Sequence, residues 1–221
     1  MDNASVKAYK GIGMEGIIAK WYAANTRKGL EEYKTLAREV ANELSPGSRV
    51  LELAPGPGYF AIELAKFGNY RITGLDISQT FVEIARRNAS EERVQVDFQQ
   101  GNAASTPFDS ETFDFILCRA AFKNFAEPLR ALQEMHRLLR RGGRALIIDL
   151  RRDASQEAIN QHVESMGLNM ANRVITKLTF RFMLLKRAYT KSEFQQLFSQ
   201  ANFHSVDIRD SLIGLEMWLE K

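Results

Sequence analysis

The sequence has few of the residues that mark secreted, membrane-spanning or metal-dependent proteins. Its 221 residues include one cysteine, Cys118, so an internal disulfide is excluded and a reducing, cytoplasmic location is expected. No stretch approaches the roughly 20 uninterrupted apolar residues of a transmembrane helix. The N-terminal residues lack the continuous apolar core of a signal peptide. With three histidines and one cysteine, the chain is expected to hold no metal site.

An excess of charge of one sign is also missing. The chain has 30 basic and 27 acidic residues, a net charge of +3. A balance this mild is not the electrostatic footprint of a nucleic-acid-binding protein, so no nucleic-acid partner is expected. The hydrophobic fraction of 45% is ordinary for a globular protein, and we expect one domain over residues 1–221.

What the sequence does contain is an alternation of strand-like apolar runs with helical patterns. This alternation predicts an α/β fold with a seven-stranded, mostly parallel sheet, helices on both faces and an antiparallel C-terminal hairpin. Strands are expected over 49–54, 70–77, 94–101, 113–119, 144–150, 204–212 and 214–221. The clearest helices are expected over 59–67, 78–89, 128–143 (ended by Gly142 and Gly143) and 190–202.

The stretch VLELAPGPGYF (50–60) leads from the first strand through Gly56 and Gly58 into a helix. Glycines let the backbone approach a ligand closely, and the following helix N-terminus points at that ligand. In open α/β sheets the ligand crevice lies at the carboxyl ends of the strands. The loop alone is a weak signal, because a purely structural turn would have the same composition.

Two acids sharpen the interpretation of this loop. Glu52 interrupts an apolar strand where nothing structural requires a charge, and Asp76 ends the next strand. Asp76 is suited to accept hydrogen bonds from two ribose hydroxyls, although it could also cap the helix that follows Ser78. A dinucleotide site remains open by spacing, since Ala61 is a permitted third residue of G-x-G-x-x-G, but Glu52 would repel a pyrophosphate. A cationic cofactor without phosphate, S-adenosylmethionine, suits these residues better.

Several segments between about 49 and 150 resemble the class I S-adenosylmethionine-dependent methyltransferases. They are E-L-A-P-G-P-G (52–58), G-L-D-I-S (74–78), Q-G-N-A (100–103), F-D-F-I-L-C-R (113–119) and L-L-R-R-G-G-R-A-L-I-I-D (138–149). The resemblance implies a Rossmann-like fold, S-adenosylmethionine as cofactor, and in-line methyl transfer to a small-molecule acceptor. It also implies an N-terminal helical cap (1–45), a cofactor-binding core (46–150), a helical substrate cover (151–189) and a C-terminal helix with strands (190–221).

The resemblance further implies which residues bind the cofactor. Asp76 would bind the ribose, Glu52 would orient the loop or approach the cofactor ammonium, and Arg119 would border the methionine moiety. The remaining cofactor contacts would come from Ala54, Gly56, Gly58, Ile77, Asn102, Ala103 and Ala120. Three residues depart from the family pattern. Ala54 replaces a glycine and should therefore have negative φ, Asn102 replaces an acid, and Arg141 replaces a proline.

No catalytic residue can be recognised, because an activated methyl donor needs mainly positioning of the acceptor. His162, in the expected substrate cover, and Asp149, at the end of the fifth strand, are weak candidates for a general base. His136, His204 and Cys118 are expected to be structural.

Two regions are expected to decide the acceptor. In 14–25, Ile17, Ile18, Trp21 and Tyr22 have helical spacing, which fits either packing over the sheet edge or a lid over the cofactor. In 172–187, Arg173, Lys177 and Arg181 mark either a solvated helix face or a basic, apolar cover that contacts an apolar acceptor or a membrane.

A narrower resemblance concerns the ubiquinone/menaquinone C-methyltransferases among the type 11 methyltransferases. I-A-K-W-Y (18–22) and A-A-F-K-N-F (120–125) are similar to their segments, although Ala23 stands where those proteins have an acid. This resemblance implies acceptor contacts from Trp21, Tyr22, Phe122, Lys123 and Asn124. The alternatives that remain open are another small-molecule methyltransferase, a non-catalytic cofactor-binding protein, a nicotinamide oxidoreductase, and an RNA or protein methyltransferase.

Overall fold

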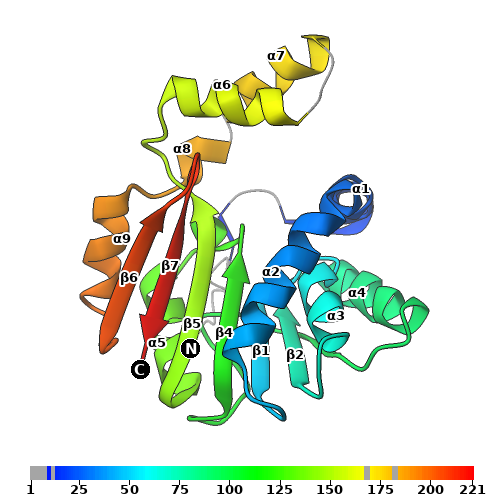
Figure 1. Cartoon of the computed structure of the whole chain (residues 1–221), viewed down its shortest axis with the longest axis vertical. Coiled ribbons are helices and arrows are strands. Elements are labelled where there is room, and N and C mark those ends of the chain that lie inside the picture. The colour runs from blue at the N-terminus through cyan, green and yellow to red at the C-terminus, as the bar shows by residue number, and fades with distance from the viewer. Residues whose placement is uncertain (1–8, 11–12, 167–169, 181–183) are drawn as a thin grey trace, which may run out of the picture.

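The computed structural model describes residues 9–10, 13–166, 170–180 and 184–221. Within these residues, seven strands form one sheet in the order β3-β2-β1-β4-β5-β7-β6 (Figure 1). The first five strands are parallel, and β7 runs antiparallel to both β5 and β6. The strands are β1 Arg49–Leu53, β2 Arg71–Asp76, β3 Asp97–Gln100, β4 Phe113–Arg119, β5 Leu139–Leu150, β6 Ser205–Asp210 and β7 Gly214–Glu220. This topology confirms the predicted fold class.

Helices cover both faces of the sheet. On one face α2, α3 and α4 pack over β1 and β2, and on the other α5 and α9 pack over β4, β5 and β7 (Figure 1). The helices are α1 Gly16–Thr26, α2 Leu30–Glu43, α3 Tyr59–Ala65, α4 Gln79–Glu91, α5 Pro128–Leu138, α6 Gln156–Ser165, α7 Met170–Thr179, α8 Leu185–Arg187 and α9 Lys191–Phe198, with 3-10 turns η1 Arg27–Gly29 and η2 Phe122–Asn124. None of the helices in the described part of the chain is long and apolar enough to cross a membrane.

Local sequence accounts for several helix starts. The Ser78 side chain accepts a hydrogen bond from the Phe81 N–H and caps α4. Thr190 and Glu193 form a reciprocal capping box at the start of α9. Both caps agree with the sequence, because each partner lies only three residues away.

Other boundaries differ from the prediction. The helix predicted over 128–143 ends at Leu138, and Gly142 and Gly143 lie within β5 instead of ending a helix. The chain turns extended at Leu139, which pairs with Phe113, and the backbone of Lys221 hydrogen-bonds to both glycines. β3 begins at Asp97 rather than 94, and α9 ends at Phe198 rather than 202.

The strand order reverses at β1, whose neighbours are β2 and β4. The carboxyl ends of these three strands therefore flank a crevice of the kind that binds ligands in open α/β sheets. α1 lies beside this edge of the sheet, and α6 and α7 project above it (Figure 1).

Candidate functional site

The glycine loop lies at the carboxyl end of β1. Gly56 and Gly58 have φ of 54° and 78°, in the left-handed region. A Cβ on Gly58 would lie 2.6 Å from Phe98 Cζ, so only glycine fits there. A Cβ on Gly56 would meet no atom within 4 Å, which leaves open space beside the loop. The sequence prediction that this loop connects β1 to a helix N-terminus is confirmed.

Ala54 contradicts one prediction. Its φ is +54°, whereas the replacement of glycine by alanine led us to expect a negative value. The Ala54 N–H donates to the Leu75 carbonyl at 2.8 Å, so pairing with β2 holds the residue in place. The turn demands a left-handed residue, and alanine adopts that conformation at a cost of about 1–2 kcal/mol.

Glu52 is buried on β1 and orients the start of α3. Its Oε2 accepts a hydrogen bond from the Ala61 N–H at 3.1 Å. Burial raises the pKa of Glu52 to about 8, although the Ala61 N–H and Arg119 act in the opposite direction. The carboxyl is therefore largely protonated at neutral pH, and it would present a charge to a cationic ligand only after releasing a proton.

Asp76 links the end of β2 to the glycine loop. One carboxylate oxygen accepts from the Gly56 N–H and the other from the Ser78 N–H, each at 2.9 Å. Burial raises the pKa of Asp76, while these two N–H groups lower it. Each oxygen keeps a second lone pair, so the carboxylate can still accept from a ligand hydroxyl. Ser78, rather than Asp76, caps α4.

The other predicted adenosine contacts lie around this carboxylate. Ile77, the next residue along the chain, is exposed. Asn102 is half-buried, and its side-chain oxygen accepts from the Ala104 N–H at 2.9 Å. Ala103 is half-buried and packs against the core.

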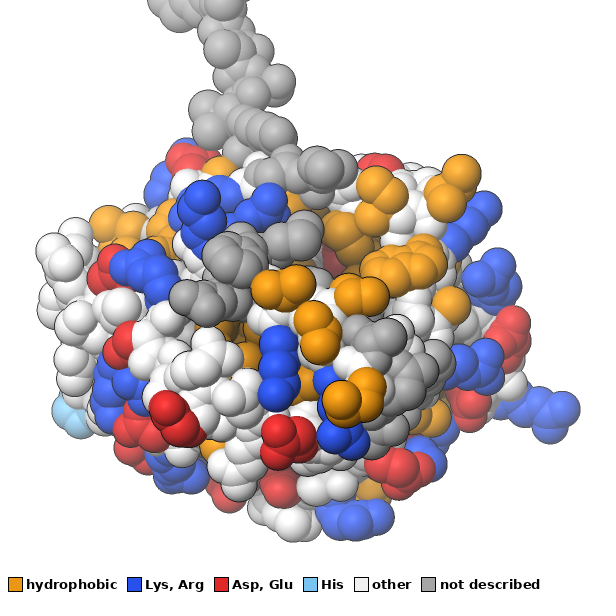
Figure 2. Space-filling view, turned by 90° about the horizontal axis from the view of Figure 1, so that it is seen from above, with side chains coloured by type: hydrophobic (Ala, Val, Ile, Leu, Met, Phe, Trp, Pro, Cys, Tyr) orange, Lys and Arg blue, Asp and Glu red, His pale blue; other side chains and the backbone are white. Residues whose placement is uncertain are grey.

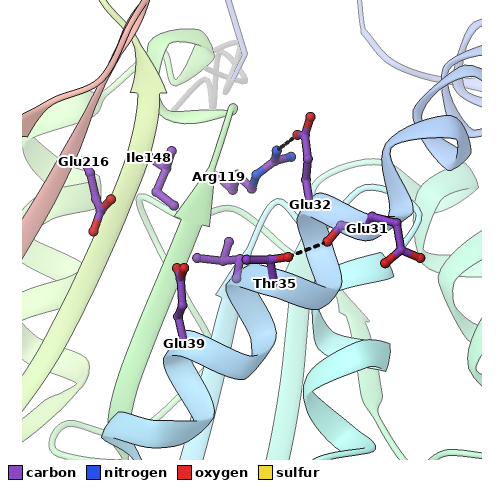
Figure 3. Close-up of a pocket in the computed structure, with 8 residues that line it drawn as sticks. Glu31, Glu32, Thr35, Glu39, Arg119, Ile148 and Glu216 are labelled. Atoms are coloured by element: carbon purple, nitrogen blue, oxygen red, sulfur yellow. Dashed lines mark hydrogen bonds and ion pairs between the residues drawn. The ribbon is translucent and has the colours of Figure 1, made fainter. Parts of the chain in front are cut away.

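Arg119 ends β4 and turns toward α2 (Figure 3). Its guanidinium pairs with Glu32 at 2.9 Å and lies over the Tyr33 ring, 4.4 Å from the ring centroid. Arg119 and Glu32 lie at an open groove of about 440 Å³. Its lining residues are Glu31, Glu32, Thr35, Leu36, Glu39, Arg119, Ile148 and Glu216. No residue of the glycine loop lines this groove, whereas Arg119, a predicted cofactor residue, does.

Lys123 and Asp149 form a buried ion pair beside the carboxyl ends of β4 and β5. The ammonium of Lys123 lies 2.8 Å from Asp149 Oδ1 and 2.6 Å from the Ala120 carbonyl. The carboxylate also accepts from the N–H groups of Lys123 and Leu150, each at 2.8 Å. Both side chains are buried. Asp149, a weak candidate base, is thus fully engaged in holding η2 and the left-handed Ala120.

The remaining candidates divide between the crevice and its surroundings. Tyr22 is half-buried with its ring against Phe81, whereas Trp21 is 66% exposed. Phe122 is buried against Tyr189 and Phe194, and Asn124 accepts the Lys10 N–H through its carbonyl. His162 lies on α6 with its ring edge against Phe180.

Of the residues expected to be structural, His136 and Cys118 lie in packed surroundings, whereas His204 is exposed. His136 packs edge-on against Phe203. Burial raises the pKa of Cys118 well above its ordinary value, so the thiol is unreactive.

Two residues near the crevice were missed by sequence reasoning. The Glu15 carboxylate accepts from the Gln79 and Thr80 N–H groups, at 3.0 and 3.1 Å. Tyr9 pairs with Phe125 in an isolated antiparallel bridge. No local signal could have found them, because their partners lie more than sixty residues away in the chain.

The residues around the loop fit S-adenosylmethionine. Carboxyl groups at the ends of β1 and β2 suit hydroxyl and ammonium groups, and open space adjoins Gly56. Among the described residues, no ion pair neutralises Glu52 or Asp76.

Comparison with known proteins agrees with this geometry. The family described as "Methyltransferase domain" matches residues 51–147. This match spans less than half of the chain, and together with the fold and the site it makes residues 51–147 similar to the class I S-adenosylmethionine-dependent methyltransferases.

Relatives and solved structures extend the similarity. A demethylmenaquinone methyltransferase of Deinococcus radiodurans is 35% identical over 108 residues, 48% of this chain and 45% of that protein. One from Staphylococcus haemolyticus is 25% identical over 229 residues, covering 97% of this chain and 93% of that protein. A structure from Methanococcus maripaludis, described as a candidate S-adenosyl-L-methionine-dependent methyltransferase, superposes with a TM-score of 0.77 at 19% identity, covering 96% and 95% of the two chains.

Proposed function

We propose that the chain transfers a methyl group from S-adenosylmethionine to a small, partly apolar acceptor, in the cytoplasm. The observation that carries the proposal is the pair of buried carboxyl groups, Glu52 and Asp76, on either side of a glycine loop that leaves open space at Gly56. When bound, S-adenosylmethionine supplies a methyl group activated by a sulfonium.

In this proposal the protein mainly binds and orients. Asp76 accepts the ribose hydroxyls, Gly56 and Gly58 border the methionine part, and Asn102 with Ala103 faces the adenine. Arg119, at the end of β4 and paired with Glu32, borders the methionine part, and Glu52 holds the first turn of α3. Because Asp149 is engaged by Lys123, we propose no catalytic base from β5.

The acceptor class follows from the surface around the crevice. Apolar side chains of α1 and α7 are exposed above the carboxyl ends of the strands, and Figure 2 shows hydrophobic side chains gathered on this face with Lys and Arg around them. They include Ile17, Trp21, Met170, Val174 and Leu178. We propose that 151–189 serves as the substrate cover and that its 172–187 segment contacts an apolar acceptor or a membrane; Arg181 of this segment lies outside the described residues.

A quinone-type acceptor is the narrower version of the proposal. It is supported by the similarity to proteins named demethylmenaquinone methyltransferase and by the F-K-N segment of η2. In this version Trp21, Tyr22 and the Phe122–Asn124 turn lie at the acceptor end. The ring carbon of a reduced quinone would be the nucleophile.

An acceptor screen tests the proposal. The protein is incubated with S-adenosylmethionine and panels of phenols, thiols, amines and quinols, including demethylmenaquinol, while S-adenosylhomocysteine and methylated product are measured by mass spectrometry. We expect product with an apolar phenol or quinol. Tight S-adenosylhomocysteine binding without turnover on any panel would instead indicate a non-catalytic binding protein, and binding of NADH alone would indicate an oxidoreductase.

A vesicle assay tests the membrane contact. Val174 on α7 is 57% exposed, and we expect Val174→Asp to lower co-sedimentation with phosphatidylglycerol-containing vesicles. Val206→Asp, at an exposed valine of β6, is the matched control. Equal binding by the two variants would contradict a membrane contact through α7.

A further inference from the structure

The residues before α1 are attached to the turn that carries Asp76. The Glu15 carboxylate accepts from the N–H groups of Gln79 and Thr80, the first residues of α4. The Ser78 hydroxyl donates to the Met14 carbonyl at 2.6 Å, and the Gly16 N–H donates to Thr80 Oγ1 at 3.0 Å. Since the N–H of Ser78 also binds Asp76, these contacts reach the predicted ribose-binding carboxylate through a single residue.

A second attachment lies at the other side of the crevice. Tyr9 pairs with Phe125, and the Lys10 N–H donates to the Asn124 carbonyl at 2.8 Å. The Lys10 ammonium reaches the Tyr189 hydroxyl at 2.7 Å. Because β1 lies between β2 and β4, the two attachments flank the end of β1 and its glycine loop.

Tyr9, which belongs to the second attachment, is half-buried. Burial raises the pKa of Tyr9, and Tyr22, Asp76 and Asp149 raise it further, against the opposing effect of Arg187. Asp76 and Asp149 end β2 and β5, on opposite sides of the crevice. The half-buried Tyr9 hydroxyl is thus within electrostatic range of both carboxylates, and it stays neutral and able to donate a hydrogen bond.

We propose that Tyr9 and Glu15 belong to the cofactor site, with Tyr9 contacting bound S-adenosylmethionine and Glu15 acting as a positioning residue for the Asp76–Ser78 turn. Glu15 acts through the start of α4, where its negative charge also interacts favourably with the helix dipole. Tyr9 acts directly, as a neutral phenol in a half-buried position.

Dissociation of S-adenosylhomocysteine, followed by stopped-flow displacement, tests this proposal without any acceptor. We expect Glu15→Ala to speed dissociation about tenfold and Tyr9→Phe at least threefold. Glu92→Ala removes an exposed, ion-paired carboxylate at the other end of α4, and Tyr70→Phe removes a hydroxyl near the amino end of β2. Both controls should stay within twofold of the unmodified protein.

Two further measurements separate positioning from simple stabilisation. Gln79 and Thr80 donate to different oxygens of Glu15, so Glu15→Gln keeps an acceptor for only one of the two N–H groups and should restore part of the slow dissociation. The double variant Glu15→Ala/Tyr9→Phe should be less than additive in the logarithm of the rate if both residues hold one ligand in place. A Glu15→Ala variant that lowers only the melting temperature, or Tyr9 and Glu15 variants that match their controls, would overturn the proposal. Because no acceptor enters the assay, failure of the acceptor screen would leave this result standing.

Discussion

Buried carboxyl groups at the two ends of the crevice have different partners. At the end of β1 and β2, Glu52 and Asp76 accept hydrogen bonds from backbone N–H groups, with no ion pair in the described part of the chain. At the end of β5, Asp149 is paired with the ammonium of Lys123. The three carboxyl groups are almost equally buried.

This difference indicates at which end of the crevice the protein itself supplies a cation for its buried carboxyl group. A buried carboxyl without a cation has a raised pKa, because burial disfavours its charged form. That is the situation of Glu52 and Asp76. The pair at β5 is complete within the protein, so we infer that the end at β1 and β2 is the one that a cationic ligand completes.

Lys123→Met should have the largest effect, because it leaves Asp149 buried without its cation. We expect a loss of about 3–5 kcal/mol in the free energy of unfolding, measured by urea denaturation. Lys123→Met/Asp149→Asn should recover part of this loss, since the amide carries no charge and its oxygen can still accept from one of the two N–H groups. A single-variant loss below about 1 kcal/mol would show that the pair is not isolated from water.

Asp76→Ala should weaken cofactor binding while the protein stays folded. We expect S-adenosylmethionine affinity to fall at least tenfold, about 1.4 kcal/mol or more, by calorimetric titration. Asp114→Ala is the matched control, because that carboxylate also accepts a backbone N–H, from Arg49, but at the amino end of β4. Unchanged affinity in Asp76→Ala would refute the ribose assignment.

Glu52→Gln should abolish the release of protons that accompanies cofactor binding. With a pKa of about 8, Glu52 is protonated in the free protein at pH 7, so binding of the cationic cofactor should release a fraction of a proton. Calorimetry in two buffers of different ionisation enthalpy measures this release, which should vanish in the variant. Release that persists unchanged in Glu52→Gln would assign it to another group.

The same variant tests stability against pH. The folded pKa of Glu52 lies above its ordinary value of 4.5, so the stability that Glu52 contributes is present at low pH. It is lost as the pH rises from about 4.5 through about 8. Glu52→Gln should flatten this part of the profile in urea denaturation. An equal fall in both proteins would contradict the raised pKa.

Ala54→Gly should have the smallest effect and the opposite sign. Relief of the left-handed alanine is worth about 1–2 kcal/mol and the added freedom of glycine in the unfolded chain costs about 0.4–1 kcal/mol, so a net gain of about 1 kcal/mol is expected. Ala120→Gly, at a second left-handed alanine, extends the comparison to the acceptor end. Destabilisation of Ala54→Gly would show that the Cβ contributes packing that outweighs the strain.

Sequence reasoning worked where a feature depends on neighbours in the chain. The glycine loop that connects β1 to α3 and the alternation of strands with helices depend on residues within a few positions of one another. It failed at Ala54, where the family turn imposes a φ that alanine disfavours, and at Leu139, where pairing with Phe113 overrides a helical pattern.

The candidate site was predictable in part for the same reason. Glu52, Gly56, Gly58 and Asp76 are readable because strands of a parallel sheet end at one edge. The mutual pairing of Lys123 with Asp149, the direction of the Arg119 side chain and the attachments of Tyr9 and Glu15 were not readable. Each depends on which residues from distant segments meet after packing.

By itself, therefore, the sequence determined the order of strands and helices, the glycine loop and the acids that follow β1 and β2, because periodicity and backbone preference are local. The tertiary structure decided which of the buried acids at the strand ends is paired with a cation. The partner of a charged group and its distance from water are set only when distant segments pack together. That decision separates Asp149, neutralised by Lys123, from Glu52, whose pKa burial raises to about 8.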